Sequence, residues 1–214
     1  MDNHKTKISL KIALFAVLLV SALNVRAQES KPIYKTGDLI FQDLDCGGLC
    51  DAIEDVTQGY KDYRFSHVGL VYGHNDSLFA IESIGPGVKL TYLPVFLQRT
   101  NINVPARLKA EFQPLIAKAI EFSIAQLGKP YDDEFIYDNG KYYCSELLYD
   151  AFKYANNNEP FFELQPMTFK KPGTDSYFPV WEDYYGELKM EIPEGEMGCN
   201  PGGLSRSDRI DILK

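Results

Sequence analysis

The chain has 214 residues, of which 45% are hydrophobic and 24% are charged, as is ordinary for a globular protein of one domain. This composition excludes wholesale disorder, a collagen-like repeat and a coiled coil. Thirty acidic residues against 22 basic ones give a formal charge of -8. An acidic surface repels phosphate backbones and anionic lipid headgroups, so we expect no nucleic-acid partner.

The first 27 residues have the pattern of a secretory signal peptide. Three lysines precede an apolar run over 12–23, and Ala27 follows where a signal peptidase would cleave. The apolar run is too short for a comfortable membrane span. We therefore predict a signal peptide over 1–27 and one domain over 28–214, exported to a periplasm or secreted, with no stable membrane span after processing. An uncleaved anchor is the alternative.

Four cysteines lie in the part expected to be exported, where disulfides are permitted: Cys46, Cys50, Cys144 and Cys199. The spacing leaves open whether Cys46 bridges Cys50 or whether one of them pairs with Cys199. A zinc site built from Cys46, Cys50 and a histidine would lack a second matching pair of ligands. We expect no metal and no cofactor.

The first half of the chain after the signal has strand patterns. Residues 37–41 read as a short strand, and 51–58 as a short helix or loop. The apolar runs 65–72 and 78–83 flank a cluster of turn residues, which predicts a hairpin. Two further strands are expected over 88–92 and 104–108, so the centre of the chain is predicted to be an antiparallel sheet.

The second half changes to a helical period. Apolar residues predict one helix over 112–127, which Gly128 and Pro130 end, and a second from Tyr142 or Cys144 to about Ala155. Beyond Pro160, large aromatic residues lie among prolines and glycines without sustained periodicity. We interpret that segment as a packed aromatic loop layer that walls a groove.

Cys144 stands at the start of the second predicted helix. Unpaired backbone N–H groups and the helix dipole favour negative charge there, so a thiol at this place ionises more readily. Leu148 and Ala151 follow at i+4 and i+7, which puts the sulfur on the stripe that faces the rest of the fold. The alternative is a buried structural cysteine, which is the commoner case by frequency.

His67 and Glu82 lie on the two strands of the predicted hairpin. If the turn is centred between His74 and Asn75, the two side chains face each other directly, with Cβ atoms roughly 4.5 to 5.5 Å apart. The carboxylate would then fix one imidazole nitrogen while the other takes the thiol proton. Alone, His67 would be a satisfied core histidine and Glu82 a solvated charge. Both strands are apolar on both faces, however, so Glu82 needs a partner.

Other residues are weaker candidates for the same roles. His74 falls in the predicted turn, where exposure is the simplest expectation. Asp38, Asp132 and Asp133 are alternative orienting carboxylates with less geometric support.

The motifs taken together resemble a known family, the circularly permuted NlpC/p60 papain-like cysteine hydrolases of the YaeF/YiiX type. The residues that carry the resemblance are Gly37-Asp38-Leu39, Ser66-His67-Val68-Gly69-Leu70, Ile81-Glu82-Ser83, Gly128-Lys129-Pro130-Tyr131-Asp132, Tyr143-Cys144-Ser145-Glu146-Leu147, Trp181-Glu182-Asp183-Tyr184-Tyr185 and 198–205. Their order is the specific signal, because histidine and glutamate precede the cysteine, the reverse of ordinary papain-like enzymes. The resemblance spans about residues 35–207.

The resemblance implies an α+β papain-like fold in which an antiparallel sheet packs against the cysteine-bearing helix. It implies Cys144 as nucleophile, His67 as base and then acid, Glu82 as the residue that orients His67, and Tyr131 as a substrate-binding residue. The backbone N–H of Cys144 would form part of an oxyanion hole.

The reaction implied is hydrolysis of an amide bond, in a cell-wall peptide or an N-acyl substrate, through a thioester on Cys144. The partner would be a small peptide, a cell-wall fragment or a lipid-like molecule. Two alternatives stay open: a lipid-directed hydrolase or acyltransferase, and a non-catalytic protein that binds lipid or peptidoglycan fragments on the same fold.

Overall fold

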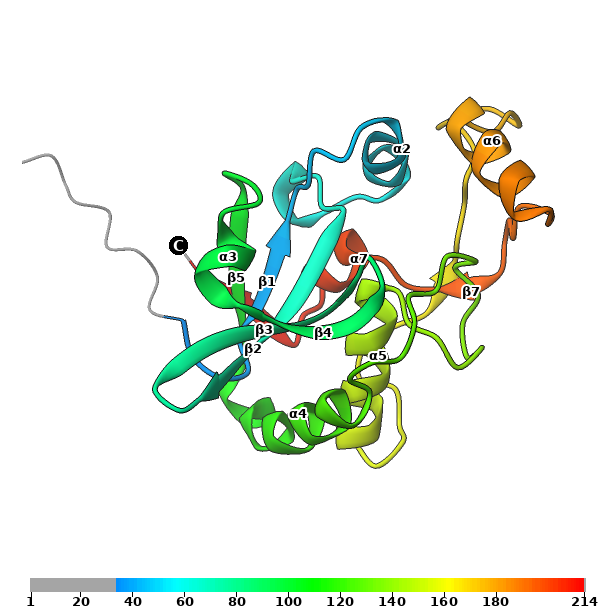
Figure 1. Cartoon of the computed structure of the whole chain (residues 1–214). Helices are drawn as coiled ribbons and strands as arrows, with labels where there is room; N and C mark the ends of the chain where they lie inside the picture. The colour runs from blue at the N-terminus through cyan, green and yellow to red at the C-terminus, as the bar shows by residue number, and fades with distance from the viewer. Residues whose placement is uncertain (1–33, 214) are drawn as a thin grey trace, which may run out of the picture. The chain divides into compact units, whose positions relative to one another are not determined.

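The computed structural model describes residues 34–213, and the main sheet of this part has six antiparallel strands in the order β4-β3-β2-β1-β5-β8 (Figure 1). The strands are β1 (Leu39–Gln42), β2 (His67–His74), β3 (Ser77–Ile84), β4 (Gly87–Tyr92), β5 (Asn103–Leu108) and β8 (Ile210–Ile212). Two short strands, β6 (Gln165–Pro166) and β7 (Met197–Gly198), pair separately. The predicted hairpin and the two further strands are confirmed.

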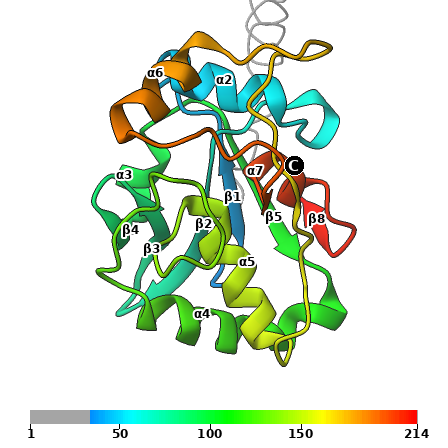
Figure 2. The ribbon, with the colours of Figure 1, turned by 90° about the vertical axis from the view of Figure 1, so that its right-hand side faces the viewer.

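Helices cover both faces of the sheet. They are α2 (Gly48–Val56), α3 (Leu93–Leu97), α4 (Ile116–Ala125), α5 (Cys144–Ala155), α6 (Pro179–Leu188) and α7 (Pro201–Ser205), with 3-10 turns at Tyr60–Asp62 and Ala110–Leu115. Helix α5 packs on β2 and β3, and α4 runs beside α5 at the bottom of the view in Figure 2. Helix α3 packs on β3 and β4.

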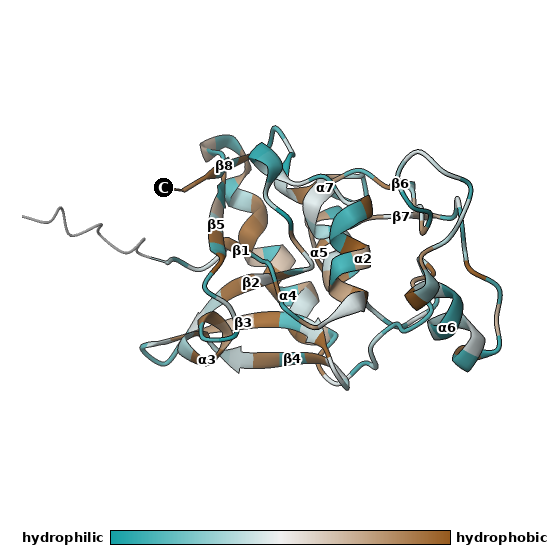
Figure 3. Cartoon of the chain, turned by 90° about the horizontal axis from the view of Figure 1, so that it is seen from above, coloured by the Kyte–Doolittle hydropathy of each residue, from teal (hydrophilic) through white to brown (hydrophobic). Residues whose placement is uncertain are grey.

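The alternation of side chains along the strands divides the core in two. Leu39, Leu70 and Ile81 are buried in the cluster that contains Leu147 of α5. Ile40, Val71 and Ala80 point to the other face and pack with Phe96 of α3. The central strands are accordingly hydrophobic in Figure 3. Burying a leucine or isoleucine of this kind contributes roughly 1.5–3 kcal/mol, so these contacts fix α5, and Cys144 with it, against the sheet.

The turn between β2 and β3 sets the register of the hairpin. Asn75 and Asp76 both have positive φ, 46° and 58°, as a two-residue type I′ turn requires. The turn is therefore centred one residue later than expected, and Leu70 pairs with Ile81. Direct pairing of His67 with Glu82 is thus wrong. The register differs by two residues, and an even difference keeps both side chains on the same face.

The segment beyond Pro160 is more regular than the loop layer expected from the sequence. It contains helix α6, which Pro179 starts at a position where proline is favourable, and the edge strand β8, which pairs with β5. The flanking prolines and glycines hid the helical spacing of Trp181, Tyr184 and Tyr185. Trp181 and Tyr185 are buried with Phe169 in an aromatic cluster, so the segment is packed, as expected.

The described residues form a single compact unit. Tyr34–Lys214 group into one compact unit by their contacts. The predicted signal peptide, 1–27, lies outside the described residues. Within 34–213, no helix combines the length and the apolar character needed to cross a bilayer.

Candidate active site

Cys144 is the first residue of α5, and hydrogen bonds made by the two residues before it, Tyr142 and Tyr143, fix its position. The backbone N–H of Asp132 donates to the carbonyl of Tyr142 at 3.1 Å, and the hydroxyl of Ser83 on β3 donates to the same carbonyl. Tyr143 is extended, and its N–H donates to the Glu146 carboxylate at 3.4 Å. Cys144 is 5% exposed, and its sulfur lies 4.0 Å from the carbonyl oxygen of Ser66.

His67, the residue after Ser66, starts β2 and is buried. Its Nε2 lies 2.7 Å from Oε2 of Glu82, so Nδ1 is the ring nitrogen left for Cys144. Burial disfavours the imidazolium, but hydrogen bonds with Cys144 and Glu82 outweigh it and raise the pKa of His67 to about 9. The site therefore favours a positively charged imidazole beside the sulfur at neutral pH.

Glu82 is fully buried on β3 and accepts hydrogen bonds at both oxygens. Arg99 binds it through two parallel contacts, Nη1 to Oε2 at 2.6 Å and Nη2 to Oε1 at 2.7 Å, and the Thr91 hydroxyl also donates to Oε1. Burial alone would raise the pKa of the carboxyl, but the hydrogen bonds from His67, Arg99 and Thr91 outweigh it and lower the pKa to about 2. Glu82 is held as a carboxylate.

Arg99 is the functional candidate that the sequence motifs missed. It lies in the loop after α3, 17 residues from Glu82, and belongs to no recognisable pattern. The available signal was indirect: a glutamate between apolar strands needs a cationic or hydrogen-bonding partner.

The alternative site residues lie elsewhere. Asp38 is bound by Arg107, and the Asp132 carboxylate accepts backbone N–H groups of its own loop. Asp133 is exposed. His74 lies at the exposed end of β2 beside Tyr72 and Asn75. The structure thus brings together Cys144, His67 and Glu82, and none of these alternatives contacts His67.

A cleft of about 220 Å³ opens beside Cys144. The start of α5 forms one side, and Tyr131 also lines the cleft. Burial and the charge of the neighbouring Cys144 raise the pKa of Tyr131 well above its ordinary value. Mostly apolar side chains from α2, the loop before α5, β6, the segment after β6 and α6 complete the walls: Ile53, Val56, Phe135, Pro166, Met167, Phe169 and Trp181. The aromatic segment therefore walls a groove, as expected.

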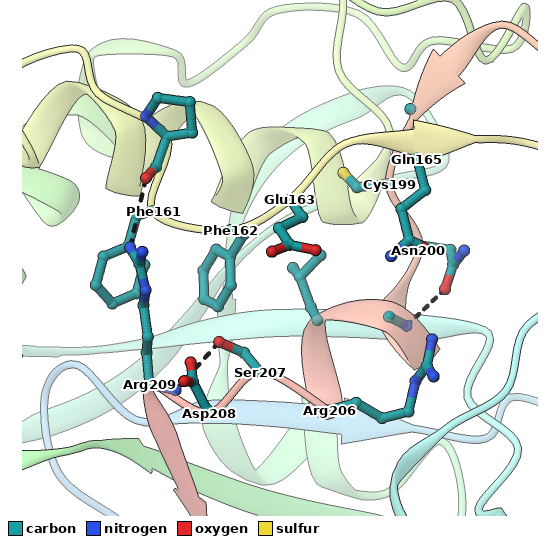
Figure 4. Close-up of a pocket in the computed structure, with 14 residues that line it drawn as sticks. Phe161, Phe162, Glu163, Gln165, Cys199, Asn200, Arg206, Ser207, Asp208 and Arg209 are labelled. Carbon is teal, nitrogen blue, oxygen red and sulfur yellow. Dashed lines mark hydrogen bonds between the residues drawn. The ribbon is translucent and has the colours of Figure 1, made fainter.

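A second hollow of about 610 Å³ adjoins this cleft (Figure 4). Phe161, Phe162 and Arg209 line it on one side. Gln165, Cys199, Asn200 and Arg206 line both hollows, so the two hollows are neighbours. None of the predicted site residues lines the second hollow.

Cys46 and Cys50 form a disulfide, which decides the pairing left open by the sequence. Cys199 has a free, buried thiol, and burial raises its pKa well above the ordinary value. Within the described range, no three His, Cys, Asp or Glu side chains are grouped so as to hold a metal ion.

A sheet that carries histidine and glutamate, packed against a helix that begins with cysteine, defines a papain-like cysteine hydrolase with the histidine strand first. The family model of the permuted papain-like amidases, YaeF/YiiX, C92 family, matches residues 33–213, and the chain belongs to this family. The family is one of enzymes. The resemblance and the fold class inferred from the sequence are thereby confirmed.

A solved structure has the same fold. The crystal structure described as metalloprotein yiiX from Escherichia coli O157:H7 superposes with a TM-score of 0.68 at 23% sequence identity. The match covers 84% of this chain and 96% of that chain. No curated protein matches the chain significantly.

Proposed function

We propose that this protein is an exported cysteine hydrolase that cleaves an amide bond through a thioester on Cys144. The observation that carries the proposal is the chain of contacts from the Cys144 sulfur at the cleft, through His67, to the buried carboxylate of Glu82. A thiolate beside an imidazolium is the arrangement that nucleophilic cysteine catalysis needs.

The reaction follows from these positions. Nδ1 of His67 takes the thiol proton, and the sulfur attacks the carbonyl carbon while the carbonyl electrons move to oxygen. The backbone N–H of Cys144 at the start of α5 donates to that oxyanion. His67 returns the proton to the nitrogen of the leaving amine, and the C–N bond breaks. Water, deprotonated by His67, then attacks the thioester, which releases the acid and restores the thiol.

The cleft supports a substrate with an apolar group beside the scissile carbonyl. Ile53, Val56, Phe169 and Trp181 supply apolar surface within the same cleft as the sulfur, and Tyr131 lines the same cleft. We assign Tyr131 to substrate binding on this basis. A cell-wall peptide of the type that NlpC/p60 enzymes cleave and an N-acyl amide both meet these requirements.

The apolar walls also favour a second candidate, a hydrolase or acyltransferase directed at lipid esters. The same thioester chemistry applies, with an alcohol in place of the amine as leaving group. A purely binding role would not require the chain of contacts from Cys144 to Glu82.

A metal takes no part in this proposal, although the related structure is described as a metalloprotein. Nε2 of His67 and both oxygens of Glu82 already bond to protein groups. In residues 34–213 no third ligand converges with them on a common point. The residues present do not fit a metal centre, and we derive no step through one.

A substrate screen tests the proposal. The protein starting at Gln28 would be incubated with muropeptides, N-acyl amino acids and lipid esters, beside Cys144→Ala and Cys199→Ala variants. We expect one class to be cleaved, with turnover lost in Cys144→Ala and retained in Cys199→Ala. Turnover that survives in Cys144→Ala would overturn the proposed nucleophile, and cleavage of esters alone would favour the lipid-directed candidate.

Mass spectrometry of exported material tests the localisation. We expect Gln28 as the first residue of the exported protein. Met1 retained in a membrane fraction would show that 12–23 is an anchor and would overturn export in soluble form.

A further inference from the structure

Arg99 is placed to control the state of Glu82 without touching the cleft. Its guanidinium packs over the Phe96 ring at 5.3 Å, and the same ring lies 5.8 Å from the ring of His67. Its side chain is 23% exposed, whereas the Glu82 side chain is 0% exposed. Glu82 itself has no contact with solvent, whereas Arg99, its ion-pair partner, is partly exposed.

The two parallel contacts of Arg99 restrict Glu82 in two ways. A guanidinium fork fixes the plane of a carboxylate, which a single donor cannot do. It also supplies the positive charge that a buried carboxylate requires, because an unpaired charge between apolar strands is costly. Oε2 then lies in one direction, towards Nε2 of His67.

We propose that Arg99 is a positioning residue of the site, which keeps Glu82 ionised and in the one orientation that directs Nδ1 of His67 towards Cys144. The inference rests on the proposed catalytic roles of Cys144, His67 and Glu82. It adds a fourth member that acts through Glu82 rather than on the substrate.

The charges around Glu82 give the expected pH effect its sign. The groups that face Glu82 are His67 from β2, Thr91 and Lys89 from β4, and Arg99, while Cys144 of α5 faces His67. Among the described residues, Arg99 is the only lysine or arginine that forms an ion pair with Glu82. Without it, Glu82 takes up a proton at a higher pH, and below that pH the imidazolium of His67 loses the support of the carboxylate.

The same sheet provides a matched control. Arg107 on β5 binds Asp38 with Nε to Oδ1 at 2.6 Å and Nη2 to Oδ2 at 2.8 Å. Its side chain is 27% exposed and that of Asp38 is 1% exposed, close to the values of the Arg99 and Glu82 pair. Removing Arg107 therefore breaks an equivalent buried ion pair that does not contact His67.

The experiment compares Arg99→Gln, Arg99→Lys and Arg107→Gln, each also combined with Glu82→Gln. The rate of Cys144 modification by iodoacetamide would be followed against pH, together with kcat/KM on the substrate from the screen.

For Arg99→Gln we expect a 10- to 100-fold loss of kcat/KM. We also expect the acid-side midpoint of both profiles to move up by about one pH unit or more. Arg99→Lys should keep the midpoint of the unmodified protein, because lysine keeps the positive charge. Arg107→Gln should also leave the midpoint unchanged.

Combination with Glu82→Gln separates positioning from mere structure. If Arg99 acts through Glu82, adding Arg99→Gln to Glu82→Gln causes little further loss. Equal losses in both backgrounds, or an unshifted midpoint in a folded Arg99→Gln variant, would overturn the inference. If Arg99→Gln does not fold, a midpoint in Arg99→Lys that differs from the unmodified protein would overturn it. The modification rate needs no substrate, so this failure is distinguishable from a failure of the proposed hydrolysis.

Discussion

Two buried carboxylates, one just before β1 and one on β3, are each held by an arginine fork, and only one of them contacts a histidine. Asp38, just before β1, is bound by Arg107 and accepts the N–H of Lys35 at 2.8 Å, which closes the turn that leads into the strand. Glu82 is bound by Arg99 and gives Oε2 to His67 at 2.7 Å. The pair of Asp38 and Arg107 holds the backbone turn before β1. The pair of Glu82 and Arg99 holds the imidazole of His67, which can take up and release a proton.

The comparison shows why a buried ion pair is weak evidence of function by itself. Taking two charges out of water costs free energy that their attraction only partly returns, whether the pair is structural or catalytic. What distinguishes Glu82 is that one of its partners is His67, a titratable group whose pKa is raised to about 9 and which lies next to a sulfur at a cleft. Loss of either ion pair should therefore lower stability, whereas only loss of the Glu82 pair should lower activity.

The largest expected effect comes from His67, which is unique to the Glu82 cluster. His67→Ala should lower kcat/KM by roughly 10⁴- to 10⁶-fold, because nucleophile and base act as one unit. Cys144→Ala combined with His67→Ala should be no worse than either alone. The measurement is steady-state turnover of the screened substrate. Losses that multiply in the double variant would mean that the two residues act independently.

A smaller effect is expected from neutralising the two carboxylates. Glu82→Gln removes the charge that supports the imidazolium, so kcat/KM should fall by roughly 10- to 10⁴-fold. Asp38→Asn should lower the free energy of unfolding by about 1–3 kcal/mol and leave kcat/KM nearly unchanged. Urea unfolding and turnover of both variants check this. If Asp38→Asn lost as much activity as Glu82→Gln, the distinction between the pairs would be wrong.

The pH dependence of stability gives the smallest of the three effects. The pKa of His67 is raised from 6.5 to about 9 by folding, so the folded state holds this proton more tightly than the unfolded state does. The stabilisation is present in full below pH 6.5 and is lost as the pH rises through about 9. Urea unfolding at several pH values should show this loss in the Asp38→Asn variant and not in His67→Ala. A loss of the same size in His67→Ala would assign it to another group.

Local patterns predicted much of the fold because local chemistry determines it. The hairpin of β2 and β3 followed from two apolar runs around turn residues, and α5 followed from the helical spacing after Cys144. The register was missed by two residues because the choice between turn centres depends on which residues take positive φ. Asn75 and Asp76 do so here. Only the even size of that error kept His67 and Glu82 on one face.

Contacts between distant segments were beyond the reach of sequence patterns. Arg99 meets Glu82 because α3 turns the chain back over the sheet, and Arg107 meets Asp38 through the pairing of β1 with β5. Neither contact produces a periodic pattern in the sequence. The roles of Cys144, His67, Glu82 and Tyr131 remain predictions that the geometry supports.

The most direct test of the central claim is site-resolved modification of the two free thiols. Brief iodoacetamide treatment at pH 6, followed by peptide mass spectrometry, compares Cys144 with Cys199, since Cys46 and Cys50 form a disulfide. At pH 6 His67 is protonated and places a positive charge beside the Cys144 sulfur, whereas burial raises the pKa of Cys199. We predict modification of Cys144 alone, and its loss in His67→Ala. Equal modification of both thiols, or modification of Cys144 only after denaturation, would contradict the account.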